Sequence, residues 1–126
     1  MGPLSYPFEV EGQEKILWDP ALRVGQLYVS ITRSIGDTLG LTTGLTPNSR
    51  GGAYVDLASF QAFTQRAYET YISTTNLQMR DMIRSVLTTS IVMLTRGGGT
   101  LVRTPDREAT LMEQYDTYMR HMWVED

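Results

Sequence analysis

The chain has 126 residues, a formal net charge of −3 and an apolar fraction of 41%, which together predict one folded domain with a single modest core. It contains no cysteine, so disulfide bonds, thiolate zinc sites and cysteine nucleophiles are excluded. No apolar run reaches the about 18 residues that a membrane-spanning helix requires, and the acidic N-terminal segment is unlike a secretory signal peptide. We therefore expect an intracellular (cytoplasmic) or virion protein with no membrane partner.

The charges are segregated along the chain. Residues 1–20 carry −3, residues 21–100 carry +3 and residues 101–126 carry −3, and ten of the eleven basic residues are arginines. The excess of arginine reflects either codon usage or ion pairs at buried or interfacial positions, which arginine's planar fork favours. The positive surplus of the middle segment is too small for a nucleic-acid surface. We expect the acidic ends to neutralise the middle within the fold or between subunits.

The first 18 residues are predicted to form an extended arm. Two prolines disfavour helix, and Phe8 and Val10 alternate with glutamates, as in a half-buried strand. A turn near residues 11–14 would make the arm a small β-hairpin. Because a short hairpin is barely stable alone, the arm should pack against the core of its own chain or against a neighbouring subunit.

The first helix is predicted over residues 20–38. Asp19 and Pro20 form a helix start, with an N-cap oxygen followed by proline at N1. The helix ends either early, at Gly36, or at Gly40 in the left-handed conformation. Its apolar residues follow one helical face and are Val24, Leu27, Tyr28, Ile31, Ile35 and Leu39.

Residues 40–52 are predicted to form a long glycine-rich loop. The segment has no hydrophobic periodicity, and at about 13 residues it exceeds most connections in a compact domain. Arg50 precedes two glycines, but the Gly-x-x-x-x-Gly-Lys-Ser/Thr spacing of a phosphate-binding loop is absent and no strand is expected before it. We interpret the segment as a plain loop.

Asp56 is the predicted N-cap of a helical stretch that continues to residue 95. As one helix it would be about 60 Å long, far longer than a domain with a radius of gyration of about 14 Å. Either it protrudes and needs partners, or it breaks at residues 73–76 and restarts with Asn76 as its cap; we expect the break. Residues 86–94 are apolar or hydroxyl-bearing on every side, which predicts the most buried helical segment.

The last helix is predicted to begin at Thr104 and Pro105, after three glycines that end the preceding helix. The elements together predict an all-α fold of three or four helices with an extended N-terminal arm and long glycine-rich loops. We divide the chain into the arm, residues 1–18, and a single helical domain, residues 19–126.

Residues able to support catalysis or bind a metal are few. The one histidine is His121, whereas a metal site needs three or four converging ligands, and a zinc-protease His-Glu-x-x-His motif needs two histidines. No Gly-x-Ser-x-Gly elbow is present to position a serine. A carboxylate pair acting as acid and base stays open, although most acids lie in caps, first turns or termini. We predict no catalytic, metal or cofactor site and a protein that is not an enzyme.

Residues suited to contacts between proteins are more numerous. Tyrosine is enriched in such contacts, and two arginines four residues apart on one helix are expected to pair with the acidic ends. The interface candidates are Phe8, Val10, Trp18, Arg50, Tyr68, Tyr71, Arg80, Arg84, Tyr115 and Tyr118.

A small, cysteine-free helical protein with a docking arm and long loops is similar in profile to the connector or adaptor proteins of tailed-phage particles. The resemblance implies a structural role, in which the chain packs between protein subunits as a homo-oligomer within a larger assembly. The alternative is a small regulatory module that binds a protein or nucleic acid through its arginine-bearing helix. Since the chain is acidic, we favour the assembly role and expect no nucleic-acid partner.

Overall fold

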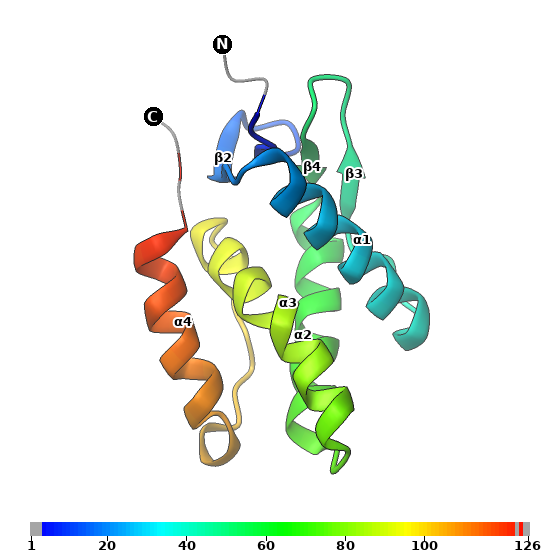
Figure 1. Cartoon of the computed structure of the whole chain (residues 1–126), viewed down its shortest axis with the longest axis vertical. Coiled ribbons are helices and arrows are strands. Elements are labelled where there is room, and N and C mark those ends of the chain that lie inside the picture. Colours follow the sequence, from blue (N-terminus) through cyan, green and yellow to red (C-terminus); the bar gives the residue numbers. More distant parts are fainter. Residues whose placement is uncertain (1–3, 123, 125–126) are drawn as a thin grey trace.

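The computed structural model describes residues 4–122 and 124, and in them four α-helices accompany a four-stranded sheet (Figure 1). The expectation of an all-α fold is therefore wrong, and the chain has an α/β fold. Each strand is only three or four residues long. Strands this short barely establish the period-two pattern by which a strand is recognised in a sequence.

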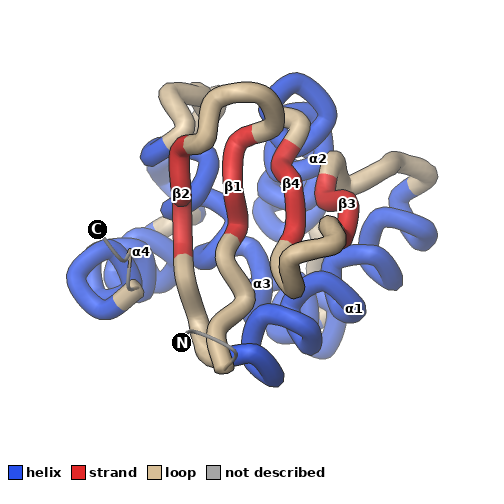
Figure 2. The backbone as a smooth tube through the Cα atoms, turned by 90° about the horizontal axis from the view of Figure 1, so that it is seen from above, coloured by secondary structure: helices blue, strands red, loops and turns tan. Residues whose placement is uncertain are grey.

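The sheet consists of two hairpins placed side by side. The strands are β1 (Phe8–Val10), β2 (Lys15–Trp18), β3 (Leu45–Pro47) and β4 (Ala53–Val55), in the spatial order β2-β1-β4-β3. Pairing is antiparallel within each hairpin and parallel between β1 and β4. Figure 2 shows the helices gathered behind one face of this sheet.

The first hairpin confirms the predicted turn near residues 11–14. Gly12 and Glu14 have positive φ angles of 80° and 54°, which the tight reversal requires. Phe8 and Leu17 are fully buried, and Trp18 is 7% exposed. The arm therefore packs against the core of its own chain, which is one of the two alternatives that the sequence left open.

The second hairpin lies in the segment predicted to be a plain loop, so that prediction is wrong. Residues 45–47 and 53–55 pair as β3 and β4, and Arg50 lies in the turn between them. Asn48 closes the turn, because its Oδ1 accepts hydrogen bonds from the backbone N–H of Arg50 at 2.9 Å and of Gly52 at 3.1 Å. Gly52 also lies close to the residue that precedes β1, and a Cβ there would lie 2.3 Å from the carbonyl oxygen of Pro7.

The first helix, α1 (Leu22–Leu39), ends at Gly40, which has φ 74° in the left-handed region. Of the two predicted ends, Gly36 and Gly40, the structure confirms Gly40. Gly36 lies inside the helix, where a Cβ would come within 2.7 Å of the Leu41 carbonyl oxygen. Ala21 occupies the N-cap position without a side-chain hydrogen bond, so Asp19 does not cap this helix.

The predicted break near residues 73–76 is confirmed. It separates α2 (Leu57–Ser73) from α3 (Leu77–Arg96), and the Asn76 Oδ1 accepts a hydrogen bond from the Met79 backbone N–H at 2.9 Å. Asp56 is the N-cap residue of α2, but its side chain accepts from the Ser59 hydroxyl at 2.8 Å instead of from the backbone. The two helices therefore form a hairpin that fits within the domain.

The last helix, α4 (Ala109–His121), begins four residues later than predicted. Pro105–Arg107 form a 3₁₀ turn that precedes it. None of the helices in the described part of the chain is long and apolar enough to span a membrane.

The core is centred on α3, and the prediction for its second half is confirmed because every residue from 86 to 94 is buried. On the sheet side, Phe8 stacks on Trp18 with ring centroids 5.3 Å apart, and Tyr28 meets both rings edge-on at 5.5 Å. The Tyr28 hydroxyl and the Ser90 Oγ are hydrogen-bonded at 2.6 Å, which joins α1 to α3. Burial raises the pKa of Tyr28 well above its ordinary value.

We predict that Ile91→Ala lowers the free energy of unfolding by about 2–5 kcal/mol, because Ile91 is 5% exposed within the core and its truncation leaves a cavity. The measurement is chemical denaturation of the full chain. Leu77→Ala is the matched control on the same helix, since Leu77 is 73% exposed and its truncation should cost less than about 0.5 kcal/mol. Equal costs at the two positions would contradict this packing.

Candidate functional site

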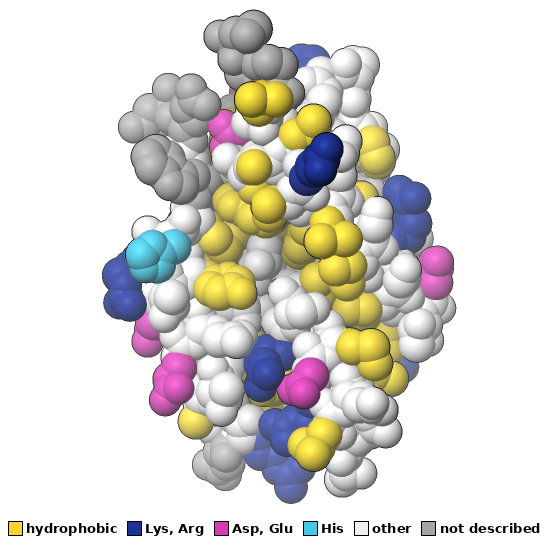
Figure 3. Space-filling model, in the orientation of Figure 1, with side chains coloured by type: hydrophobic (Ala, Val, Ile, Leu, Met, Phe, Trp, Pro, Cys, Tyr) yellow, Lys and Arg dark blue, Asp and Glu magenta, His cyan; other side chains and the backbone are white. Residues whose placement is uncertain are grey.

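An apolar groove runs between α1 and α3 on the face shown in Figure 3, where hydrophobic side chains gather along it. It consists of two adjoining hollows of about 520 and 590 Å³, which share Ile31 and Ser85. The first hollow also has walls from the end of β2 and from α4. The α1/α3 groove, as we call it, is lined by Trp18, Asp19, Pro20, Ala21, Val24, Leu27, Tyr28, Ser30, Ile31, Ser34, Ile35, Thr38, Leu39, Met79, Met82, Ile83, Ser85, Val86, Thr89, Tyr118, His121 and Met122.

Apolar residues of α1 line this groove because a different face of the helix packs against the core. Gly25, Val29, Thr32 and Gly36 are buried with Tyr28. A Cβ at Gly25 would lie 2.6 Å from the Cβ of Tyr6, so the absence of a side chain allows the close approach of the helix. Small residues therefore seat α1, and part of the apolar stripe seen in the sequence is left outside the core.

Three large apolar side chains stand out from the groove walls. Val24 is 51% exposed and Leu27 60% exposed on α1, and Met82 is 60% exposed on α3. Single exposed apolar residues are ordinary on a protein surface, whereas exposed apolar residues that flank one apolar groove are typical of an interaction site.

Three of the hydroxyl groups that line the groove donate hydrogen bonds to the backbone of their own helix. Ser34 Oγ donates to the Ser30 carbonyl at 3.2 Å, Thr38 Oγ1 donates to the Ser34 carbonyl at 3.0 Å, and Ser85 Oγ donates to the Met82 carbonyl at 2.7 Å. Each hydroxyl proton is thus bound by its own helix. An apolar surface can cover these residues without leaving the donors unsatisfied.

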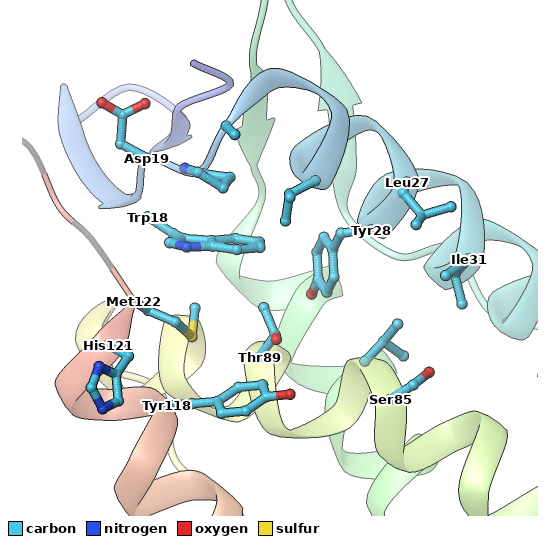
Figure 4. A pocket seen from close by; sticks show the side chains of 14 residues that line it. Trp18, Asp19, Leu27, Tyr28, Ile31, Ser85, Thr89, Tyr118, His121 and Met122 are labelled. Atoms are coloured by element: carbon cyan, nitrogen blue, oxygen red, sulfur yellow. The ribbon is translucent and has the colours of Figure 1, made fainter. Parts of the chain in front are cut away.

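The ionisable side chains of the groove lie in its first hollow and do not converge. Figure 4 shows Trp18, Tyr28 and Met122 around the hollow, while the Asp19 carboxylate and the His121 ring point away from one another. The second hollow is lined by no Asp, Glu, Lys, Arg or His. Among residues 4–122 and 124, no group of three or more His, Asp or Glu side chains could hold a metal ion. The arrangement is suited to binding an apolar surface.

Arg96 fixes the α4 wall of the groove. Its guanidinium donates to the carbonyl oxygens of Leu17 at 2.9 Å, Met119 at 3.2 Å and Met122 at 3.1 Å. A cation at the C-terminal end of α4 also interacts favourably with the helix dipole, and burial lowers the pKa of this guanidinium. The sequence places Arg96 at the end of its own helix but does not reveal that it also binds the end of α4.

A second polar cluster fixes the other end of α4. The Tyr68 hydroxyl donates to Glu108 Oε2 at 2.5 Å and accepts from the Thr104 backbone N–H at 2.6 Å. Arg103 donates to Glu108 Oε1 from Nε at 2.9 Å and also pairs with it through Nη2. Hydrogen bonds from Arg103 hold the pKa of Glu108 below its ordinary value, and burial raises the pKa of Tyr68. The Glu108 carboxylate is therefore bound by Tyr68 and Arg103, and it is not an exposed acid in the first turn of a helix.

Five of the ten interface candidates are enclosed by their own chain. These side chains are at most 7% exposed and contribute to the core: Phe8, Val10, Trp18, Tyr68 and Tyr71. The edge of Trp18 still lines the groove, as does half-buried Tyr118. Tyr115 packs against the cluster of α2, α3 and α4.

The arginine candidates have partners within the chain. Arg50 pairs with Glu9 at 2.6 Å on the sheet, and Arg84 pairs with Asp81 at 3.1 Å on its own helix. The Arg80 guanidinium lies 4.9 Å from the centre of the Tyr71 ring. The expectation that Arg80 and Arg84 pair with the acidic ends is therefore wrong for the described residues. Of the three ion pairs among those residues, one, between Arg50 and Glu9, joins the acidic N-terminal segment to the basic middle. Of the residues that line the groove, sequence analysis proposed only Trp18 and Tyr118 for an interface, and it missed the exposed Val24, Leu27 and Met82.

Comparison with known proteins identifies a family. Residues 4–124 match the profile of a family described as "Family of unknown function (DUF6086)", and because the match spans nearly the whole chain, the chain belongs to this family. No curated protein and no solved structure matches the chain.

We predict that Glu108→Gln lowers the free energy of unfolding by about 1–3 kcal/mol at neutral pH, since it removes charge-assisted hydrogen bonds to a buried carboxylate. A carboxyl whose pKa is lowered on folding adds stability above its unfolded pKa, about 4.3, and this contribution is lost as the pH falls through the folded value. Urea denaturation from pH 7 to pH 3 should therefore show the two proteins converging in acid. Exposed Glu113→Gln is the control, and the same convergence there would contradict the role of Glu108.

Proposed function

We propose that this member of the DUF6086 family is a non-enzymatic assembly protein that binds another polypeptide in the α1/α3 groove. The proposal depends above all on one observation, which is that exposed Val24, Leu27 and Met82 flank a continuous apolar hollow. Burial of each large apolar side chain contributes about 1.5–3 kcal/mol. A bound partner would recover part of this free energy, which folding alone leaves unused.

The shape of the groove favours a helical partner. The 18 residues of α1 make one wall about 27 Å long, and the second hollow is lined by uncharged residues throughout. An amphipathic helix that lays its apolar face between two helices is a common mode of recognition. The hydrogen bonds that Ser34, Thr38 and Ser85 donate within their own helices support such a dry contact.

The likeness to phage connectors depended on a free arm and long loops. Those segments form the sheet, so we propose the coarser role of a subunit in an assembly and name no particular particle. We place this assembly inside a cell or in a particle made there, because a chain without cysteine is typical of a compartment in which disulfides are not used.

We predict no binding of DNA or RNA at physiological ionic strength, since Arg80 and Arg84 are already engaged by Tyr71 and Asp81. The measurement is fluorescence anisotropy of a labelled random-sequence duplex and of a single strand. Phosphate binding would weaken steeply with salt. Micromolar, salt-sensitive binding that is lost in Arg80→Ala and Arg84→Ala would favour the regulatory alternative.

The assembly role is tested by photo-crosslinking in cells that produce the chain. A benzophenone amino acid at position 27 or 82 should form a discrete adduct with a bound polypeptide, because both side chains lie at the groove and are 60% exposed. The same residue at position 113, which is exposed on α4 outside the groove, is the control. No adduct at positions 27 and 82, or equal adducts at all three positions, would refute the proposal.

A further inference from the structure

We infer that the polypeptide bound in the α1/α3 groove is a second copy of this chain, with the two α1 helices antiparallel across a two-fold axis near Ser30. The inference rests on the proposed function, since it names the partner of that same groove. An isologous pair of this kind uses one surface twice, so the surface must be complementary to itself. Shape and charge along α1 both meet this condition.

The two halves of α1 differ in bulk in a complementary way. Val24 and Leu27 project from the first half, whereas Ser34 and Thr38 in the second half border the hollow of about 590 Å³. An antiparallel arrangement places the bulky half of each copy against the hollow half of the other. A parallel arrangement would place bulk against bulk and leave the second hollow unfilled.

The charges on the exposed flank of α1 show the same complementarity. Arg23 and Asp37 are 14 residues apart, which separates them by about 21 Å along the helix and by about 40° around it. Neither side chain belongs to an ion pair among the described residues. Because residue 30 is the midpoint between them, the antiparallel arrangement brings each Arg23 beside Asp37 of the second copy and forms two equivalent ion pairs.

The area required extends the interface beyond α1. A stable interface buries about 800 Å² on each partner, and a helix about 27 Å long and about 10 Å wide presents less than half of that as a flat face. The α3 wall with Met82 must therefore contribute, which distinguishes this dimer from a simple pair of α1 helices.

The inference is tested by sedimentation equilibrium of the full chain and of charge-reversal variants. The unaltered chain should form a dimer, and Arg23→Asp or Asp37→Arg should each raise the dissociation constant about tenfold, because each replaces two attractive pairs with two repulsive ones. The double variant restores both pairs in reversed order and should recover the original dissociation constant. Met82→Asp should abolish the dimer.

Matched controls separate the pair from total charge. Arg66→Asp and Glu113→Arg make the same charge changes at exposed positions of α2 and α4 and should leave the dissociation constant unchanged. Circular dichroism should show every variant folded, since each altered side chain is exposed.

Each remaining outcome overturns the inference. A chain that is monomeric at every concentration overturns the inference. If position 27 of such a monomer still crosslinks to a different polypeptide, the proposed assembly role stands, but the partner is not a second copy of the chain. A dimer that tolerates both charge reversals, or a double variant that does not recover, rejects the antiparallel arrangement. A monomer without crosslinks rejects the inference and the proposed function together.

Discussion

Residues 86–94 of α3 are buried on every side of the helix, and the positions of the other elements follow from this requirement. An apolar helix needs a cover around its whole circumference, and the sheet, α1, α2 and α4 together supply it. Tyr28 bonds to Ser90 from α1, and Arg96 binds β2 and the end of α4 at the last turn of α3. The cover is complete only over residues 86–94 of α3. At Met82 and Ser85 the helix is exposed, and there the groove lies.

The groove therefore results from a difference in how α1 and α4 pack against the rest of the chain. Helix α1 approaches the core through Gly25 and Gly36, where added side chains would collide with Tyr6 or with the Leu41 backbone. This close contact turns Val24 and Leu27 away from the core and toward the open side of α3. Arg96 and the Tyr68–Glu108 contact hold α4 at its two ends, so polar interactions fix the α4 wall of the groove.

Local rules in the sequence predicted those parts of the fold that local interactions determine. The Asn76 cap, the end of α1 at Gly40 and the burial of residues 86–94 each depend on neighbouring residues or on one helical face. The first hairpin was predicted, but the four-stranded sheet was missed because its strands are very short and because the parallel pairing of β1 with β4 joins segments far apart in the sequence. The second hairpin also carries glycine and proline, which are typical of loops. Trp18 and Tyr118 were identified as surface candidates and do line the groove, but an apolar stripe alone does not show which face of α1 meets the core.

Folding and the proposed binding consequently depend on different residues of the same helix. A side chain at Gly25 would meet Tyr6 at 2.6 Å and would displace α1, so it would disturb both the core and the groove. Leu27 has most of its surface in solvent, so a polar residue there removes contact area from the groove while the helix stays seated. Because surface substitutions of this kind usually change stability little, the affinity of the groove for a partner can vary without a loss of the fold. The assembly role that we propose requires such a separation, since the folded chain must be stable before a partner binds.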